Sequence, residues 1–345
     1  MGKHLLLWLL AGQTAIGLAG EPAGNRYQFT QIEMAVPIKI TLYASDRPTA
    51  SRAAQAAFDR FHALNSICSD YDPQSELRRL CRTSSAGHPV RVSSDLWRVL
   101  VRAQELAARS GGAFDVTIGP VVRLWRNARR TKELPAPESL AEARSRVGYQ
   151  WMRLNSHDQS VELLKANMRL DLGGIAKGYA VDEAMAALRR HGIARMMVEA
   201  GGNLGLGDPP PGKAGWRIGI APPDARRPPH EYLELARCAV STSGDMWQYA
   251  IIGGKRYSHL IDPHSGLPLT DHSSVTVVGP DGLSTDGLSS AAAILGPEKG
   301  LKLVESARHS AAFIVRTVDG REQTFQSKHW HDLPRAGELG AAPGI

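Results

Sequence analysis

Stretches with the hydrophobic period of helices and of strands follow one another in an irregular order, and that order limits the folds this chain can adopt. Alternating apolar residues predict a strand near 38–42. A period of three to four over 51–67 and 94–109 predicts two helices, the second with Ser93 or Ser94 as its N-cap. Further helices are expected near 139–146, directly after 171–178, near 286–295 and from Pro297, and short strands near 152–154, 161–163, 196–198, 216–220, 239–241, 274–278 and 312–315. This mixture indicates an α+β domain rather than a regular βαβ series.

The composition is that of a globular protein with a packed core. The chain has 345 residues, of which 43% are apolar and 22% charged, and its formal net charge is +7. The basic residues occur in scattered pairs without interleaved aromatic residues, so the pattern argues against a nucleic-acid-binding protein. A positive overall charge would instead favour an anionic small ligand.

The N-terminus has the three-part pattern of a secretory signal. Residues 1–4 are positive, 5–10 are apolar, and 15–19 are apolar and small. Because glycine and polar residues interrupt it at 12–14, the stretch is a poor membrane span. We expect it to be removed as a signal peptide; retention as an anchor or as a cytoplasmic leader is the alternative.

The composition of the two ends sets the expected domain boundaries. A Gly-, Ala- and Pro-rich stretch follows Trp330. We therefore expect a signal peptide and leader over 1–24, a single catalytic domain over 25–330 and a flexible tail over 331–345.

The three cysteines, Cys68, Cys81 and Cys238, lack metal-ligand spacing. In an exported chain they allow at most one disulfide, for which Cys68 and Cys81 are the nearest pair. Burial as small apolar side chains is the favoured interpretation.

Two glycine-rich segments suit the binding of an anion. In 111–120, Asp115 stands between glycines, a pattern that fits either a ligand-binding loop or a tight structural turn. In 171–179, glycines precede a helix start and Lys177, so backbone N–H groups, the helix dipole and an ammonium group can face a phosphate. The spacing is not that of a Walker loop. The glycines of 201–207 do not fit a dinucleotide-binding fold and indicate a loop beside a strand.

Two polar segments carry groups suited to proton transfer and to cation binding. His259 stands three residues before Asp262 in a loop that ends at Gly266, where it can accept a proton from a hydroxyl or merely satisfy a turn. Asp286 and Ser290 lie one helical turn apart, so both side chains face the same way. Their oxygens, with a backbone carbonyl, suit Mg²⁺ or Ca²⁺; the structural alternative is an N-cap aspartate and a buried serine.

Taken together and in this order, the segments resemble the bacterial FAD:protein FMN transferases, the ApbE family. Three of them read Gly112-Ala-Phe-Asp-Val-Thr117, Leu172-Gly-Gly-Ile-Ala-Lys177 and Asp286-Gly-Leu-Ser-Ser290. The full set comprises Met34, 69–77, 112–120 with Trp125, 172–182, 201–203, 242–244, 259–266 and 286–290. Each piece alone is weak, and their common order over most of the chain makes the resemblance specific.

The resemblance implies a single T-fold-like α+β domain with a mixed or antiparallel sheet and packed helices, which binds FAD in an extended cleft. It implies FAD contacts from Met34, Tyr71, Ala113, Phe114, Asp115, Lys177, Thr242 and Leu260. It also implies that Mg²⁺ is held by the main-chain oxygen of Gly174 and by the side chains of Asp286 and Ser290.

The activity implied by the resemblance is Mg²⁺-dependent transfer of FMN from FAD to a Thr or Ser hydroxyl of an acceptor protein, with release of AMP. His259 would be the base, and Asp286 would hold the cation that neutralises the phosphates. Membrane redox subunits would be the acceptors. The chain itself would be periplasmic, without a lipid anchor and, after signal removal, without a membrane span. Two alternatives stay open: an FAD pyrophosphatase and a non-catalytic exported FAD-binding protein.

Overall fold

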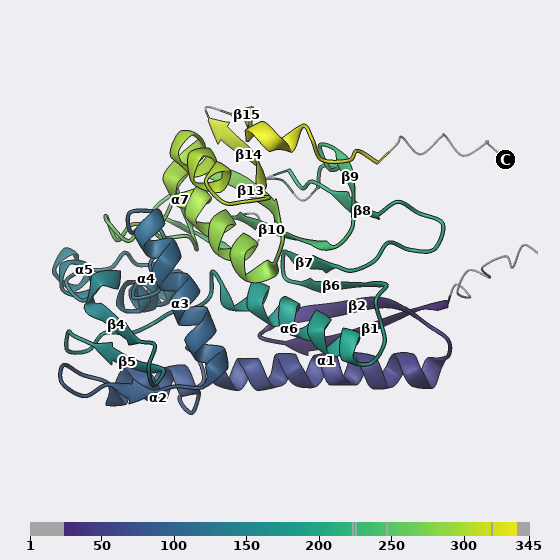
Figure 1. Cartoon of the computed structure of the whole chain (residues 1–345). Coiled ribbons are helices and arrows are strands. Elements are labelled where there is room, and N and C mark those ends of the chain that lie inside the picture. Colours follow the sequence, from purple (N-terminus) through teal and green to yellow (C-terminus); the bar gives the residue numbers. More distant parts are fainter. Residues whose placement is uncertain (1–23, 223, 225, 246–247, 319, 337–345) are drawn as a thin grey trace, which may run out of the picture.

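An eight-stranded antiparallel sheet forms the centre of the fold, in the order β1-β2-β6-β7-β10-β13-β14-β15 (Figure 1). The computed structural model describes residues 24–222, 224, 226–245, 248–318 and 320–336. Residues 1–23 of the predicted signal peptide and residues 337–345 of the predicted tail therefore lie outside the described residues. Helices packed on an antiparallel sheet confirm the predicted α+β class.

The strands of the main sheet are β1 (Asn25–Glu33), β2 (Val36–Ala44), β6 (Met196–Ala200), β7 (Asn203–Leu206), β10 (Cys238–Gly244), β13 (His272–Gly279), β14 (Ala311–Val318) and β15 (Arg321–Gln326). Three smaller sheets consist of β3 (Val90–Arg91), β5 (Ser160–Leu163) and β4 (Met152–Asn155); of β8 (Trp216–Gly219) and β9 (Tyr232–Leu235); and of β11 (Tyr249–Ile252) and β12 (Lys255–Ser258). The β11–β12 hairpin bears on function because His259 follows it directly.

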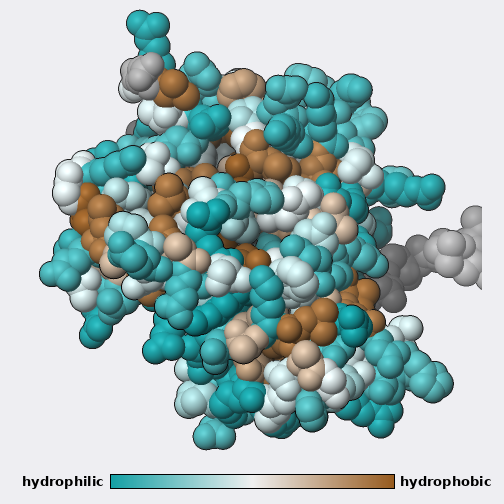
Figure 2. Space-filling model, turned by 90° about the vertical axis from the view of Figure 1, so that its left-hand side faces the viewer, coloured by the Kyte–Doolittle hydropathy of each residue, from teal (hydrophilic) through white to brown (hydrophobic). Residues whose placement is uncertain are grey.

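Three helices pack against the main sheet: α1 (Arg47–Cys68), α6 (Ala176–Arg190) and α7 (Gly282–Glu305). The other helices gather with the β3–β5 sheet at one side of the molecule (Figure 1), and they are α2 (Glu76–Thr83), α3 (Ser94–Arg109), α4 (Gly119–Thr131) and α5 (Pro137–Arg144). On that side, hydrophobic residues are visible as separate patches among hydrophilic ones (Figure 2). Most large apolar side chains are inside the fold.

Local sequence signals fix where α1 and α3 begin. Asp46 caps α1 by accepting a hydrogen bond from the backbone N–H of Thr49 at 2.8 Å. Ser93 caps α3 in the same way through the N–H of Leu96 at 3.3 Å, which decides between the two serines considered. The helical period of α1 buries an apolar face against the main core, as predicted, through Phe58, Phe61 and Leu64.

The two helices predicted on either side of Pro297 form one kinked element, α7. Gly296 has a φ of 74°, which lies outside the helical region. Beyond the kink the helix returns toward its own first half, because a Cβ on Gly300 would lie only 2.7 Å from the carbonyl oxygen of Ala292. The kink ends the straight segment on which Asp286 and Ser290 stand.

Several elements of the structure were not predicted. β1 and β15 are the outer strands of the main sheet and bury little, while α2 and α4 are rich in arginine. The segment 201–207, interpreted as a loop, contains the interior strand β7. Within the predicted tail, residues 331–336 reach β9, where the N–H of Glu234 donates to the carbonyl of Pro334 at 2.9 Å.

All three cysteines are free in the structure. Cys68 is buried at the end of α1, and burial raises the pKa of its thiol to about 12. The thiol of Cys81 accepts a hydrogen bond from the N–H of Leu170 at 3.3 Å. The expected burial is therefore confirmed for Cys68, whereas Cys81 and Cys238 are only partly buried, and the Cys68–Cys81 disulfide is not formed.

Helices α6 and α7 meet so closely that only glycine fits at their crossing. A Cβ on Gly178 would lie 2.0 Å from the carbonyl oxygen of Gly282.

We expect Gly178→Ala to lower the free energy of unfolding by about 1–3 kcal/mol, because the two helices must separate. Urea unfolding would measure this change. Ala186→Ser, on a partly exposed position of α6, is the control and should change stability by no more than about 0.5 kcal/mol; equal losses would contradict the close-packing argument.

Candidate active site

The structure brings the three predicted cation ligands together where the start of α6, the first half of α7 and β10 meet. The hydroxyl of Ser290 lies 3.5 Å from the carbonyl oxygen of Gly174, toward which it donates. One turn earlier on α7, the Oδ2 atom of Asp286 accepts a hydrogen bond from the N–H of Gly178 at 2.9 Å. From β10, the hydroxyl of Ser243 contacts that of Ser290 at 3.2 Å.

Asp286 is a buried carboxylate with few partners of its own. It is 4% exposed. Burial raises its pKa, while the charge of Lys177, the N–H of Gly178 and the side chain of Asn203 act in the opposite direction. A nearby cation would stabilise the ionised form of a carboxyl group that is buried in this way.

The donor set fits Mg²⁺ by its chemistry. We refer to the main-chain oxygen of Gly174, the carboxylate of Asp286 and the hydroxyl of Ser290 as the oxygen donor set. All three are hard oxygen ligands, and Mg²⁺ completes its shell with water and substrate phosphates. Within the described part of the chain, no group of three or more His, Cys, Asp or Glu residues could hold a metal. A cation would therefore depend on mixed oxygen donors of this kind.

Beside the donor set, the start of α6 presents positive charge. Its N-cap residue, Ile175, makes no side-chain capping hydrogen bond. Instead, the N–H of Gly178 in the first turn donates to Asp286, so Asp286 stands at the positive end of the helix dipole. Lys177 stands in the first turn and donates from Nζ to the carbonyl of Gly173 at 2.8 Å. This arrangement suits a phosphate-bearing ligand.

Tyr71 is linked to the same segment through a charged network that the sequence pattern did not reveal. The guanidinium of Arg126 lies 4.1 Å from the centre of the Tyr71 ring. The same guanidinium pairs with Asp171 at 2.7 Å and with Asp70. Tyr71 is 72% exposed, so its ring is free to contact a ligand.

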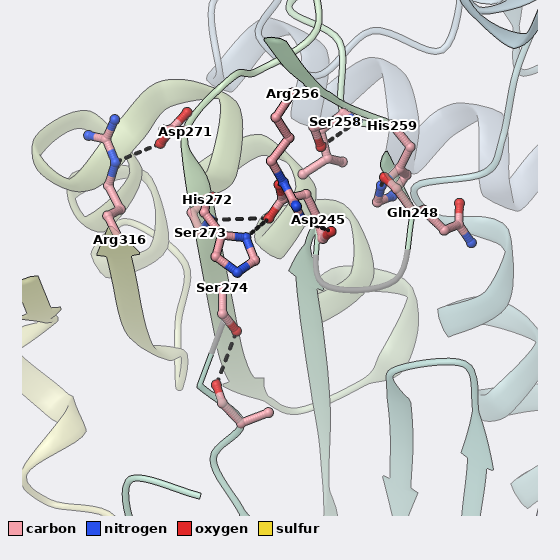
Figure 3. A network of polar contacts seen from close by, with 12 residues as sticks. Asp245, Gln248, Arg256, Ser258, His259, Asp271, His272, Ser273, Ser274 and Arg316 are labelled. Atoms are coloured by element: carbon pink, nitrogen blue, oxygen red, sulfur yellow. Dashed lines mark hydrogen bonds and ion pairs between the residues drawn. The ribbon is translucent and has the colours of Figure 1, made fainter. Parts of the chain in front are cut away.

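His259 has the geometry of a base. Its Nδ1 lies 3.1 Å from the carbonyl oxygen of Gln248, which also accepts from the backbone N–H of His259 at 3.0 Å (Figure 3). Because a carbonyl only accepts, Nδ1 carries the proton and Nε2 keeps its lone pair. Burial, with the positive charges of Lys177 and Arg129, lowers the pKa of His259 to about 4. The imidazole is therefore neutral near pH 7.

The carboxylate of Asp115 accepts hydrogen bonds from within the fold. Its Oδ1 accepts from the N–H and the hydroxyl of Thr117 at 2.8 and 2.7 Å, and its Oδ2 accepts from the N–H of Tyr149 at 2.7 Å. Of the two interpretations of 111–120, these hydrogen bonds fit the tight structural turn. Ala113 and Phe114 are buried beside it. Phe114 borders the donor set, since a Cβ on Gly174 would lie 3.3 Å from its ring.

The remaining predicted FAD contacts lie on neighbouring elements. Met34, expected in a strand, occupies the turn between β1 and β2 with a φ of 49° and packs on the main core. Thr242 lies on β10, where its N–H donates to the carbonyl of Gly202 at 2.9 Å. Leu260 follows His259 and is partly buried against the main core.

The structure also shows polar residues near the donor set that were not predicted as site residues. Asn203 and Ser243 stand on interior strands, and Asn203 accepts a hydrogen bond from the buried hydroxyl of Ser241 at 2.6 Å. A sequence signal existed, because buried strands seldom carry such polar groups without a reason.

In the described residues, no helix is both long and apolar enough to cross a bilayer.

Comparisons with known proteins agree with the resemblance seen in the sequence. The model of the ApbE family matches residues 34–314. A protein of Haemophilus influenzae named FAD:protein FMN transferase is 35% identical over 265 residues, covering 74% of this chain and 76% of the relative. One of the same name from Vibrio cholerae is 32% identical over 326 residues, covering 93% and 97%. The apo structure of Pseudomonas stutzeri flavinyl transferase ApbE, 31% identical, matches with a TM-score of 0.79 over 91% of this chain and 98% of that chain. The fold is thus the predicted ApbE-type fold, and the chain belongs to the ApbE family.

Proposed function

We propose that this protein transfers FMN from FAD to a threonine or serine hydroxyl of an acceptor protein and releases AMP. Membership of the ApbE family makes the chain an enzyme of the transferase class, and the matched relatives are named FAD:protein FMN transferase. The observation that carries the proposal is the convergence of Gly174, Asp286 and Ser290 beside the start of α6.

Phosphoryl transfer depends on positioning and on charge compensation. Bound Mg²⁺ would neutralise the pyrophosphate charge and help AMP to leave. Lys177 and the start of α6 add positive charge that the chain itself supplies. Gly174 places its main-chain oxygen, not a side chain, next to Ser290, so a small residue there suffices.

His259 activates the acceptor in this mechanism. Its Nε2 takes the proton of the incoming hydroxyl, whose oxygen attacks the FMN-side phosphorus. The new oxygen–phosphorus bond forms as the bond to the AMP oxygen breaks, and AMP leaves with the electron pair of that bond. Gln248 holds the tautomer that leaves Nε2 free.

The lowered pKa of His259 predicts the acid limb of the pH profile. The active base is the neutral imidazole, so kcat/KM should fall as the pH drops through about 4, where this group becomes protonated. An unperturbed histidine would place the limb near its ordinary value of 6.5. Rates measured from pH 4 to 8 test this; a half-maximal point near 6.5 that His259→Ala abolishes would contradict the assigned environment.

A direct test of the function compares incubation of the protein with FAD and Mg²⁺ in the presence and absence of an acceptor. Intact mass spectrometry should show the acceptor heavier by one phosphoester-linked FMN, with AMP formed in equal amount. Formation of FMN and AMP without attachment would identify an FAD pyrophosphatase instead. FAD binding without AMP would identify a non-catalytic carrier.

The N-terminal sequence suggests the place of action, and the family resemblance suggests the acceptor class. We propose that the chain is exported to the periplasm through its N-terminal segment and that membrane redox subunits are its acceptors. Fractionation of cells that express the full chain, followed by fluorescence of covalently bound flavin in membrane proteins, tests both points. Flavin attached only to cytosolic proteins would contradict them.

A further inference from the structure

Asp245 is a buried carboxylate to which the mechanism assigns no role. It directly follows β10 and is 2% exposed. Nε of Arg256, from β12, donates to its carboxylate, and Nη2 of Arg256 donates to its main-chain oxygen at 2.8 Å (Figure 3). From β13, Nδ1 of His272 lies 2.6 Å from Oδ1, and the N–H of Ser273 donates to the same atom at 3.3 Å. One carboxylate therefore joins three strands.

The strands that Asp245 joins carry the two halves of the site. β10 carries Ser243, whose hydroxyl contacts Ser290 of the donor set at 3.2 Å. The β11–β12 hairpin carries His259 at its base, where Gln248 and His259 continue the ladder by a hydrogen bond of 3.0 Å. Asp245 lies two residues after Ser243 and three residues before Gln248, so along the chain it stands between a contact of the donor set and the hydrogen-bond partner of the base.

Asp245 contacts the β11–β12 hairpin through the side chain of Arg256. Its guanidinium lies 3.4 Å from the centre of the Tyr249 ring, and Tyr249 pairs with Ser258 in the hairpin register. The guanidinium is thus held by a buried carboxylate, by a main-chain oxygen and by an aromatic face. This fixes the last residues of β12, immediately before His259.

We propose that Asp245 is a positioning residue for the transfer reaction: through Arg256 and His272 it holds the β11–β12 hairpin against the main sheet and thereby keeps His259 aligned with the oxygen donor set. The inference rests on the proposed function and adds a residue to it. Alignment matters because a displacement of about 1 Å at a reacting group can cost about 100-fold in rate.

The charge of Asp245 also acts on His259. It raises the pKa of His259, as does the hydrogen bond from Nδ1 to Gln248, while burial and the positive charges of Lys177 and Arg129 lower it. Removal of the Asp245 charge should therefore lower the pKa of His259 further. The acid limb of the pH profile should move to lower pH, which the loss of a purely structural contact would not cause.

The test uses the full-length protein with FAD, Mg²⁺ and an acceptor. Asp245→Asn should lower kcat by about 10- to 100-fold, with KM for FAD changed by no more than about 3-fold. Asp271→Asn is the matched control. It removes the same charge one residue before His272, but Asp271 pairs with Arg316 at 2.8 Å, as Figure 3 shows, and kcat should stay within about 2-fold of the wild-type value.

A double-mutant comparison decides whether Asp245 acts through His259. In a His259→Ala background, Asp245→Asn should cost less than about 2-fold, because no base is left to align. The same loss in both backgrounds, or a wild-type kcat for Asp245→Asn, would overturn the inference. If Asp245→Asn does not fold, Arg256→Lys takes its place, because lysine keeps the charge but loses the forked contact with Asp245. Its kcat is then compared with that of the wild type, and its effect is measured again in the His259→Ala background. A wild-type protein without transfer activity would overturn the proposed function itself, and this inference with it.

Discussion

Replacing Asp286 with asparagine is expected to lower the rate of FMN transfer by about 1,000-fold or more. Of the oxygen donor set, Asp286 alone is anionic, so its loss removes both a ligand and the charge that holds a divalent cation. Asparagine keeps the shape and an oxygen that can accept from Gly178. The measurement is the rate of FMN attachment to an acceptor at saturating FAD and Mg²⁺.

Stability provides a second readout for Asp286→Asn. Burial raises the pKa of Asp286 above its ordinary value of 3.8. At a pH above 3.8, ionisation of this buried carboxyl group therefore destabilises the metal-free folded state, and asparagine, which does not ionise, removes that destabilisation. Without Mg²⁺ the Tm of the variant should equal or exceed that of the wild type. Added Mg²⁺ should raise the Tm of the wild type only.

Asp281→Asn is the matched control for Asp286→Asn. It makes the same change on the same helix, at the N-cap, where Oδ1 accepts from the N–H of Ser284 at 2.7 Å. Asparagine caps helices about as well as aspartate, so transfer should stay near the wild-type rate. Equal loss in both variants, or a Mg²⁺-dependent rise in Tm for Asp286→Asn, would contradict the assigned donor set.

Replacing His259 with alanine should lower kcat by about 100- to 10,000-fold and leave a residual rate. Binding of FAD and the stabilisation by Mg²⁺ should persist, since the donor set lies on other elements. The acid limb of the pH profile should disappear with the imidazole. Single-turnover kinetics with radiolabelled FAD would separate binding from transfer.

His264→Ala tests whether the effect is specific to His259. His264 is an exposed histidine five residues further along the same segment, with its N–H bonded to Asp262 at 2.9 Å. Its removal should leave kcat within about 2-fold of the wild-type value. A His259→Ala variant as active as His264→Ala would remove His259 from the mechanism.

Local sequence patterns were sufficient for the parts of the site that lie on one element. Asp286 and Ser290 were predicted to share a helix face because the helical period places residues i and i+4 together, and α7 confirms it. The approach of Gly174 to Ser290, 116 residues away in the chain, has no local signal. Only the resemblance to the ApbE family implied it.

The rest of the site depends on tertiary packing. At Asp115, the hydrogen bond that favours the structural turn comes from the N–H of Tyr149, 34 residues away. The junction at Asp245 joins three strands through Arg256 and His272, none of which has a spacing that marks it. Such contacts form when strands pack, so single-sequence patterns do not contain them.

The most direct test of the oxygen donor set is a crystal structure of the wild-type protein grown with FAD and Mn²⁺, which replaces Mg²⁺ at oxygen sites and scatters X-rays anomalously. We expect an anomalous peak in contact with the carbonyl oxygen of Gly174, the carboxylate of Asp286 and the hydroxyl of Ser290, next to the pyrophosphate of FAD. A pyrophosphate bound elsewhere, or a peak away from these three oxygens, would contradict it.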